Sequence, residues 1–445
     1  MKEKKASILS LGIPIFIQLF LFNLLNSIDV LMINSYNENY VLAMNNASTV
    51  INMLNVLLMI CSTGVGIVIS QYLGAKQKDD AKKAFNNGII FNFCLSLVLM
   101  AILLISQKYL LQLIDCPEEY INDAMLYLSI VSFGMPCSAI VNIIAANLRS
   151  NQKPAFMTVI AVISNILNVI LNYILIFGKL GIPPLGIKGA AIATLVSQII
   201  TLILALVAAP ILLKDKIYSL KFSFYHLKKV LLIGLPSALE SFCYTISGLF
   251  VTAAVNQLTK AEMLARSYIN LIMTYIYQFS VAFGQANAIL VGHDVGEGKY
   301  LQAKKRTYQS YLLCFPILLM VILLLNLFGE DIIYLIVKDQ EDYQSVINYA
   351  TSILSYMFIY ETGRCINLIF INSLKASGDV VFPLIGAIIS MFIFSSLGSW
   401  VLGIWLKLGF LGIFLAQALD ECVRAIMMLF RWQNNKWMNK SIIRK

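Results

Sequence analysis

The sequence has few charged residues for its length. Only 13% of its 445 residues are Asp, Glu, Lys or Arg, whereas 59% are hydrophobic. Soluble domains are about 25% charged and about 45–50% apolar. A soluble chain of this size has too little interior to bury so much apolar surface, so lipid is its expected solvent. The composition therefore excludes a soluble enzyme, a disordered chain and a secreted disulfide scaffold.

Residues that bind metals or nucleotides are also scarce. The chain has two histidines, His226 and His293, and none of its eight cysteines forms a CxxC pair. A zinc or haem site built on histidine is therefore not expected, and the cysteines are expected to be small buried hydrophobic residues. No GxxxxGK[ST] phosphate-binding loop is present, so ATP is not expected to drive the protein directly. Neither a metal cluster nor a catalytic dyad stands out, and no enzyme activity or organic cofactor is predicted.

Long apolar runs fill the rest of the sequence. A membrane-spanning helix needs about 20 mainly apolar residues. Twelve segments meet this length: 9–33, 44–71, 86–106, 120–148, 155–178, 188–213, 228–256, 263–291, 306–328, 343–374, 381–403 and 409–431. The first run continues past Leu31 and has no small-residue cleavage site, so it is expected to be a spanning helix rather than a signal peptide. The predicted fold is an all-α integral membrane protein with twelve transmembrane helices.

The distribution of basic residues predicts the orientation. Of the 33 Lys and Arg residues, all but nine lie in the terminal segments or in loops that follow even-numbered spans. The opposite loops contain Lys108, Lys179, Lys188, Lys260, Lys338 and Lys407, and three arginines fall within spans. Because basic residues collect on the cytoplasmic side, both termini are expected there, in the inner (cytoplasmic) membrane of the cell. The same rule accounts for the net charge of +10 without nucleic-acid binding.

The chain contains an internal repeat. Pro14 and Gly74 align with Pro236 and Gly296 at a shift of 222 residues. Gly189 lies over Gly412 at a shift of 223. Six spans per half is an even number, so the two halves are parallel and pseudo-symmetric six-helix bundles. Parallel halves place a cavity at their interface, and rocking one half against the other exposes it alternately to each side. This arrangement predicts a secondary transporter.

The repeat also predicts the domain boundaries. The first six-helix lobe is expected over residues 1–213 and the second over 230–445. A basic cytoplasmic linker is expected over 214–229.

Several motifs resemble those of a known transporter family. Gln152–Thr194, with its Asn-rich helix and its Gly-Ile-Lys-Gly-Ala-Ala turn, is similar to the fifth and sixth helices of the MATE (multidrug and toxic compound extrusion) family. Gln71–Ala75 resembles the end of its second helix, and Leu374–Asp379 resembles the turn after its tenth. The resemblance covers essentially the whole chain, and places it in the bacterial part of the MOP exporter superfamily. It implies an exporter in which an inward Na⁺ or H⁺ gradient expels amphipathic, often cationic, organic compounds.

A first candidate site surrounds Asp29, the one carboxylate well within a span of the first half. Asn168 and Asn172 are four residues apart and share a helix face, and the resemblance places them with Thr194 beside the aspartate. Carboxylate, amide and hydroxyl oxygens suit Na⁺, and a desolvated carboxylate can instead carry H⁺. Some family members have Asp where this chain has Asn172, and the missing charge favours proton coupling slightly. The alternative is a partly hydrated, structural Asp29 near the outer end of its helix.

The second half has acids and bases within its spans. Glu361 and Arg364 are three residues apart, and Asp420 and Arg424 are four apart, so each pair shares a helix face and can neutralise itself. These four residues form a predicted charge network, either structural or functional. The resemblance matches Asp420 and Arg424 to an acid and an arginine in the last helix of one bacterial branch.

A substrate site is predicted from a further set of residues in the second half. Glu240 follows Pro236 by one helical turn and, with Arg266, is a candidate second titrating or cation-binding site. Tyr244, Met273 and Tyr277 are candidates for lining a cavity for apolar cations through cation–π contact and adaptable packing. Packing or lipid-facing roles are the alternative.

The intramembrane charges favour one of two transport functions. With Asp29 they comprise five carboxylates and three arginines, a sum of −2. An acidic interior favours an exporter of organic cations. The protein is expected to be a monomer in contact with membrane lipids. The alternative is a flippase for lipid-linked oligosaccharides from the same superfamily, which is expected to need a basic cavity for pyrophosphate.

Overall fold

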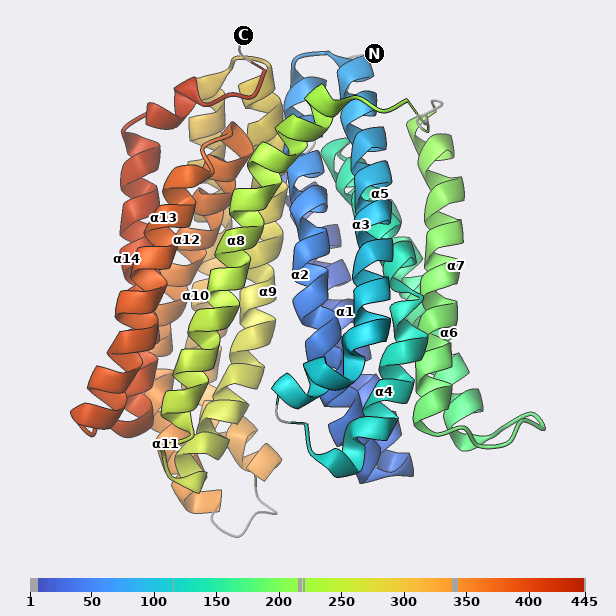
Figure 1. Ribbon diagram of the computed structural model, residues 1–445. Coiled ribbons are helices and arrows are strands. Elements are labelled where there is room, and N and C mark those ends of the chain that lie inside the picture. Colours follow the sequence, from blue (N-terminus) through green and yellow to red (C-terminus); the bar gives the residue numbers. More distant parts are fainter. Residues whose placement is uncertain (1–6, 115, 215–217, 219–220, 338–342, 444–445) are drawn as a thin grey trace. The chain divides into compact units, whose positions relative to one another are not determined.

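The computed structural model describes residues 7–114, 116–214, 218, 221–337 and 343–443 (Figure 1). Residues 215–217 and 219–220 of the predicted linker lie outside this part of the chain, as do seven basic residues used to predict the orientation. These are the residues at positions 2, 4, 5, 216, 338, 444 and 445.

Helices occupy each predicted span of the first half. They are α1 (Ile8–Tyr36), α2 (Glu38–Gly74), α3 (Lys78–Leu113), α4 (Glu118–Ser132), α5 (Met135–Ser150), α6 (Pro154–Phe177) and α7 (Ile187–Leu213). The predicted span 120–148 is divided between α4 and α5, which are bent by 49°. Pro136 lies at the start of α5, where its missing amide hydrogen leaves no helical hydrogen bond unmade.

The described part of the second half repeats this pattern. Its helices are α8 (Phe224–Val255), α9 (Lys260–Gly296), α10 (Tyr300–Val337), α11 (Tyr343–Leu354), α12 (Met357–Ser377), α13 (Val381–Ser390), α14 (Gly409–Gln433) and a final 3₁₀ turn, Lys436–Asn439. The predicted span 343–374 contains α11 and α12. The span 381–403 contains α13 and two π-helical stretches, Met391–Leu397 and Ser399–Trp405. The all-α fold with twelve spanning segments is therefore confirmed, with three spans built from more than one helix.

A stricter criterion of helix length and hydropathy recognises fewer than the twelve predicted spans. Eight helices, or nine segments with the bent α4–α5 pair, are apolar enough to cross a membrane by this test among the described residues. The remaining segments are α9, the α11–α12 pair and α14. Of all helix pairs in the described chain, α12 with α14 and α12 with α9 pack most extensively. These helices can be less apolar because they face one another rather than lipid.

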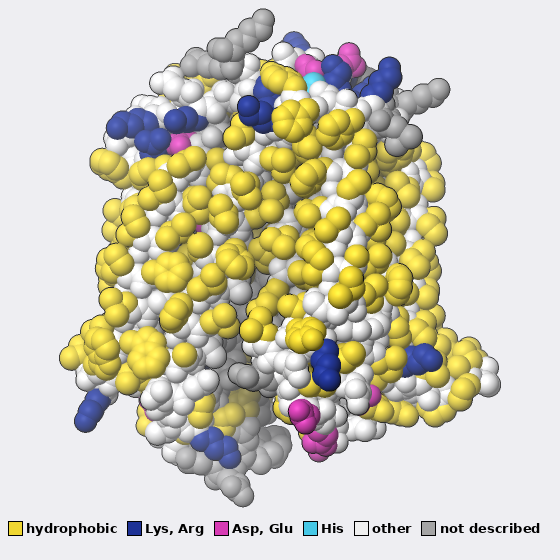
Figure 2. All heavy atoms as spheres, viewed as in Figure 1, with side chains coloured by type: hydrophobic (Ala, Val, Ile, Leu, Met, Phe, Trp, Pro, Cys, Tyr) yellow, Lys and Arg dark blue, Asp and Glu magenta, His cyan; other side chains and the backbone are white. Residues whose placement is uncertain are grey.

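Side chains on the helix surfaces fit a membrane environment. On the face drawn in Figure 2, hydrophobic side chains cover the length of the helices, and charged side chains gather near the helix ends. Exposed large hydrophobic residues include Ile105, Leu113 and Leu327. In water such surface would aggregate, whereas lipid solvates it.

The described chain forms two compact units, and two helices contribute to both. One unit comprises residues 17–238, and the other comprises 1–16 with 239–445. The division therefore falls within α1 and within α8. The start of α1 packs on α9, where Phe16 meets Phe279 edge to face at 5.5 Å. The start of α8 packs on α2, where a Cβ on Gly234 would lie 1.9 Å from the Ile60 carbonyl oxygen.

The repeat has a structural counterpart at the turns before α7 and α14. Gly186 and Gly409 both have positive φ, of 53° and 60°. One turn later, a Cβ on Gly189 would lie 2.6 Å from the Leu175 carbonyl oxygen. A Cβ on Gly412 would lie 2.5 Å from the carbonyl oxygen of Leu402. Both contacts are with backbone, which cannot rotate away, so glycine is required at both places.

We expect Gly189→Ala and Gly412→Ala each to destabilise the protein by about 1–3 kcal/mol, because the added methyl group overlaps backbone atoms. The measurement is thermal unfolding of the purified protein in detergent. Gly248→Ala is the control, because a Cβ at Gly248 meets nothing within 4 Å. An unchanged midpoint in the first two variants would contradict the close approach.

Candidate functional site

Asp29 lies in a hydrogen-bonded group formed by α1 and α6. The Asn172 side-chain nitrogen donates to Asp29 Oδ1 at 2.6 Å and to Asn168 Oδ1 at 3.0 Å. Asn168 and Asn172 are buried, at 2% and 0% exposure, and Asp29 is half-buried. The four-residue spacing of the asparagines places both amides on the α6 face toward α1, because residues four apart share a helix face. The structure therefore brings these three predicted residues together.

Thr194 connects to this group through a residue that the sequence did not single out. Tyr127, a buried residue of α4, forms a side-chain hydrogen bond with Thr194 and interacts electrostatically with Asp29. Thr194 itself is half-buried in α7. The site is thus assembled from four helices, α1, α4, α6 and α7, all within one compact unit. No local pattern marks Tyr127 in the sequence, because only the folding of α4 against α7 brings it here.

The chemistry of the group fits a small cation. The buried Asn172 Oδ1 has no hydrogen-bond partner among the described residues. Over the same part of the chain, no Lys or Arg forms an ion pair with Asp29. A carboxylate inside a membrane needs a compensating charge. The neighbours of Asp29 found in the described part of the chain, the Asn172 amide and the Tyr127 phenol, are neutral. Oxygen atoms from Asp29, Asn168, Asn172 and Thr194 are suitable ligands for Na⁺, and Asp29 alone is sufficient for H⁺.

A second polar group joins α12 to α14. Arg364 lies 2.7 Å from Glu361 Oε1 and 3.7 Å from Glu421 Oε1. Arg424 lies 2.8 Å from the same Glu421 oxygen and 2.7 Å from Asp420 Oδ2. All five side chains are buried. Both predicted intrahelical pairs are therefore present, and Glu421 links them into one network of three acids and two bases.

Aromatic residues cover the Arg364 end of this network. The guanidinium group lies over the rings of Tyr360, at 4.2 Å, and Tyr277, at 5.3 Å. Tyr244 interacts electrostatically with Arg364, and Arg266 interacts with Tyr360. The structure thus gathers three of the predicted substrate-site residues, Tyr244, Tyr277 and Arg266, beside the charge network. A cation held between aromatic faces is a favourable arrangement in a low dielectric.

Glu240 has a different partner from the one the sequence suggested. Its carboxylate lies 2.9 Å from the Lys375 ammonium group, in the last turn of α12. The sequence assigned Lys375 to a loop and paired Glu240 with Arg266. Met273, another predicted substrate residue, is buried in α9. Lys375 directly follows the predicted span 343–374, and a long side chain at that position can reach back into the membrane. This position is the sequence feature that could have indicated the contact with Glu240.

Comparison with known proteins identifies the family. The folded chain is a multi-spanning membrane protein with buried polar sites on its helices. The MatE family model matches residues 14–174 and 236–401, so its two matches begin 222 residues apart, the shift of the internal repeat. The chain belongs to the MATE family. It is accordingly a transporter and not an enzyme, and the family needs no cofactor.

Relatives and a solved structure agree with this assignment. The uncharacterized transporter YisQ of Bacillus subtilis is 31% identical over 99% of this chain and 96% of its own length. The probable multidrug resistance protein YoeA of the same organism is 25% identical, with 86% and 83% covered. A MOP superfamily transporter from Pyrococcus furiosus has the same fold, with a TM-score of 0.87, 20% identity, and 96% and 95% covered.

Removing Arg424 should strongly destabilise the second half. Arg424→Met leaves Asp420 and Glu421 buried with one cation fewer, and breaking a buried ion pair on one side costs about 3–5 kcal/mol. Thermal unfolding in detergent is the measurement. Lys299→Met is the control, because Lys299 pairs with Glu297 at an exposed turn and such pairs contribute about 0–1 kcal/mol. Equal stability of the two variants would mean that the α12–α14 network is not a structural element.

Proposed function

We propose that the protein exports amphipathic, mostly cationic organic compounds in exchange for H⁺ or Na⁺. The observation that carries the proposal is the group around Asp29, a membrane carboxylate that accepts a hydrogen bond from the Asn172 amide and pairs with no basic residue in the described part of the chain. Such a group is expected to bind a small cation reversibly. Relatives such as YoeA are named as probable multidrug resistance proteins, which supports drug-like compounds as the exported substrates.

Binding at Asp29 would change local contacts in a way suited to coupling. A proton or Na⁺ on the carboxylate competes with the Asn172 hydrogen bond that holds α1 to α6. A ligand shifts a conformational equilibrium only through different affinities for the two states. We therefore propose that inward- and outward-open states differ in the α1–α6 contact, and that the coupling ion favours the state that releases substrate outside.

The second half is proposed to bind the substrate. Tyr244, Tyr277 and Met273 provide aromatic and thioether surface, and the adjoining network has one more acid than base. The Glu240–Lys375 pair reduces the interior charge from −2 to −1, so the preference for cations rests more on the aromatic residues than on net charge. Among the described charges within the second-half spans, acids outnumber arginines, which does not fit the basic pyrophosphate-binding cavity that the flippase alternative needs.

We propose that the protein is a monomer in the cytoplasmic membrane of a bacterium, with both termini in the cytoplasm. Residues 1–213 and 230–445 form the proposed lobes, which 214–229 connects.

Asp29→Asn should abolish efflux while leaving the protein folded, because an amide cannot carry the proton or the negative charge that attracts Na⁺. Ethidium efflux from cells measures transport, and size-exclusion chromatography of the purified variant measures folding. Asp331→Asn is the matched control, since Asp331 is an exposed acid in α10. Normal ethidium efflux by Asp29→Asn would overturn the assignment of this site.

Proteoliposomes with an imposed gradient should identify the coupling ion. We expect an inward pH gradient to drive ethidium transport more strongly than an inward Na⁺ gradient. The reason is that this chain has the neutral Asn172 at a position where a second carboxylate would strengthen a Na⁺ site. Asn172→Asp should increase the response to Na⁺. Asn39→Asp, at an exposed position of α2, is the control for the added charge. Transport that responds to neither gradient would contradict secondary antiport.

A further inference from the structure

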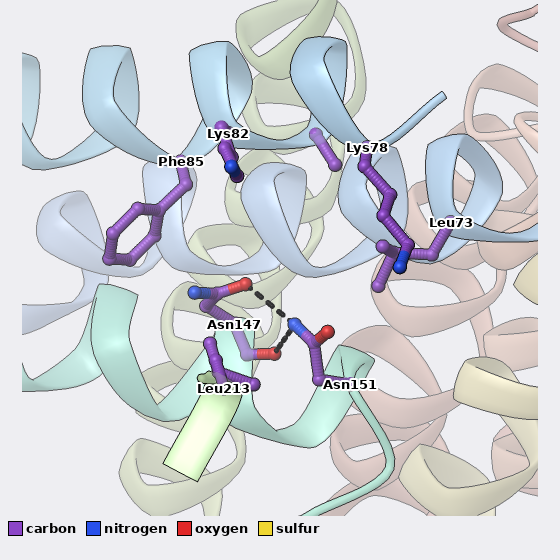
Figure 3. A pocket seen from close by; sticks show the side chains of 8 residues that line it. Leu73, Lys78, Lys82, Phe85, Asn147, Asn151 and Leu213 are labelled. Atoms are coloured by element: carbon purple, nitrogen blue, oxygen red, sulfur yellow. Dashed lines mark hydrogen bonds between the residues drawn. The ribbon is translucent and has the colours of Figure 1, made fainter. Parts of the chain in front are cut away.

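A small pocket lies at one end of the first-half helices, away from Asp29 (Figure 3). It has a volume of about 100 Å³ and is lined by the end of α2, the start of α3 and the ends of α5 and α7. A single water molecule needs only about 10–15 Å³ of such space. The lining residues are Leu73, Lys78, Ala81, Lys82, Phe85, Asn147, Asn151 and Leu213. All of them belong to the same compact unit.

The lining is positively charged. Lys78 and Lys82 are one helical turn apart on α3, so their ammonium groups reach the same side of the helix. The acids of the same turn do not line the pocket. Asp80 is bound by Lys83, at 3.2 Å, and by His226, at 3.1 Å. Among the described residues that line the pocket there are therefore two lysines and no carboxylate.

The carbonyl groups at the nearby helix ends are already bonded. The Asn151 side chain donates to the carbonyl oxygen of Asn147, at 2.9 Å, and to its amide oxygen, at 2.9 Å (Figure 3). At the end of α7, the Lys153 ammonium group donates to the Leu212 carbonyl oxygen. These bonds cover the negative ends of α5 and α7, which would otherwise repel an anion.

A buried donor remains free at the pocket. Asn147 is 5% exposed, and its amide oxygen is used by Asn151, which orients the amide group. The amide nitrogen has no hydrogen-bond partner within the described ranges. The first turn of α3 adds the positive end of a helix, whose N-cap residue, Gln77, makes no side-chain capping bond. Ammonium groups, an amide donor and a helix N-terminus together form a typical binding site for a phosphate group.

We propose that this pocket binds a phosphate group, supplied by the headgroup of an anionic phospholipid or by a soluble phosphate. Lipid is the source that the walls favour, because Leu73, Phe85 and Leu213 add apolar surface beside the lysines. The pocket also lies at the helix ends that the lysine distribution predicts to face the cytoplasm. Basic pockets between spanning helices on that side are suited to anionic headgroups. The proposal does not depend on the direction or the substrate of transport.

Native mass spectrometry of the delipidated protein tests the proposal, with phosphatidylglycerol, phosphatidylcholine and inorganic phosphate as probes. We expect phosphatidylglycerol to bind more tightly than phosphatidylcholine. Lys78→Gln/Lys82→Gln should weaken phosphatidylglycerol binding by about 25-fold, about fivefold for each lysine. Lys78→Arg/Lys82→Arg should retain binding and shows that the pocket tolerates substitution. Asn147→Asp should weaken binding as well, because it replaces the free donor with a negative charge.

A matched control separates this pocket from general surface attraction. Lys76→Gln/Lys228→Gln removes the same charge from two exposed lysines that do not line the pocket, and should bind phosphatidylglycerol like the unmodified protein. Binding of inorganic phosphate without phosphatidylglycerol would support the site and identify the source as soluble. Equal losses in the two double glutamine variants, no loss in the pocket variant, or binding of neither phosphate source would overturn the proposal. Ethidium efflux is measured separately for each variant. A failure of the phosphate-site proposal can therefore be distinguished from a failure of the transport proposal.

Discussion

The hydrocarbon core of a membrane offers no partner to a charged side chain, and this constraint governs how the helices pack. In the second half, three buried acids of α12 and α14 each contact at least one of two buried arginines. Charges lower hydropathy, and neither α12 nor α14 is apolar enough to cross a membrane by length and hydropathy alone. They are also the helices with the most extensive contacts. Burial of charge and close helix packing are therefore two consequences of the same requirement.

Asp29 meets the same requirement incompletely. Its hydrogen bond from Asn172 compensates part of the cost of burying a carboxylate, but no Lys or Arg among the described residues pairs with it. In the second-half network, in contrast, each acid contacts an arginine. A carboxylate without a basic partner can exchange a proton or a cation, whereas acids held by arginines mainly fix the positions of their helices. This difference is the physical reason for proposing the ion site in the first half and not in the second.

The sequence predicted local features well and contacts between helices poorly. Apolar run length located all twelve spans, because it depends only on neighbouring residues. The spacing within α12 and α14 likewise predicted the pairs made by Arg364 and Arg424. It did not show that Glu421 joins them, that Tyr127 reaches Thr194, or that Lys375 binds Glu240. Those contacts depend on which helix faces meet, and on breaks such as the one between α4 and α5, about which periodicity carries no information.

The two halves retain a common backbone geometry and differ in their ionisable residues. Gly189 and Gly412 make equivalent contacts with the backbone of the preceding segment, and a larger residue at either position would separate the two segments. At the same shift of 222, Asp29 aligns with Val251, and Glu240 aligns with Gln18. No other residue can replace a glycine whose Cα lies against a neighbouring backbone. A carboxylate inside the membrane, in contrast, has a free-energy cost. Each half therefore needs the shared turn to fold, whereas only the first half has an acid at the Asp29 position.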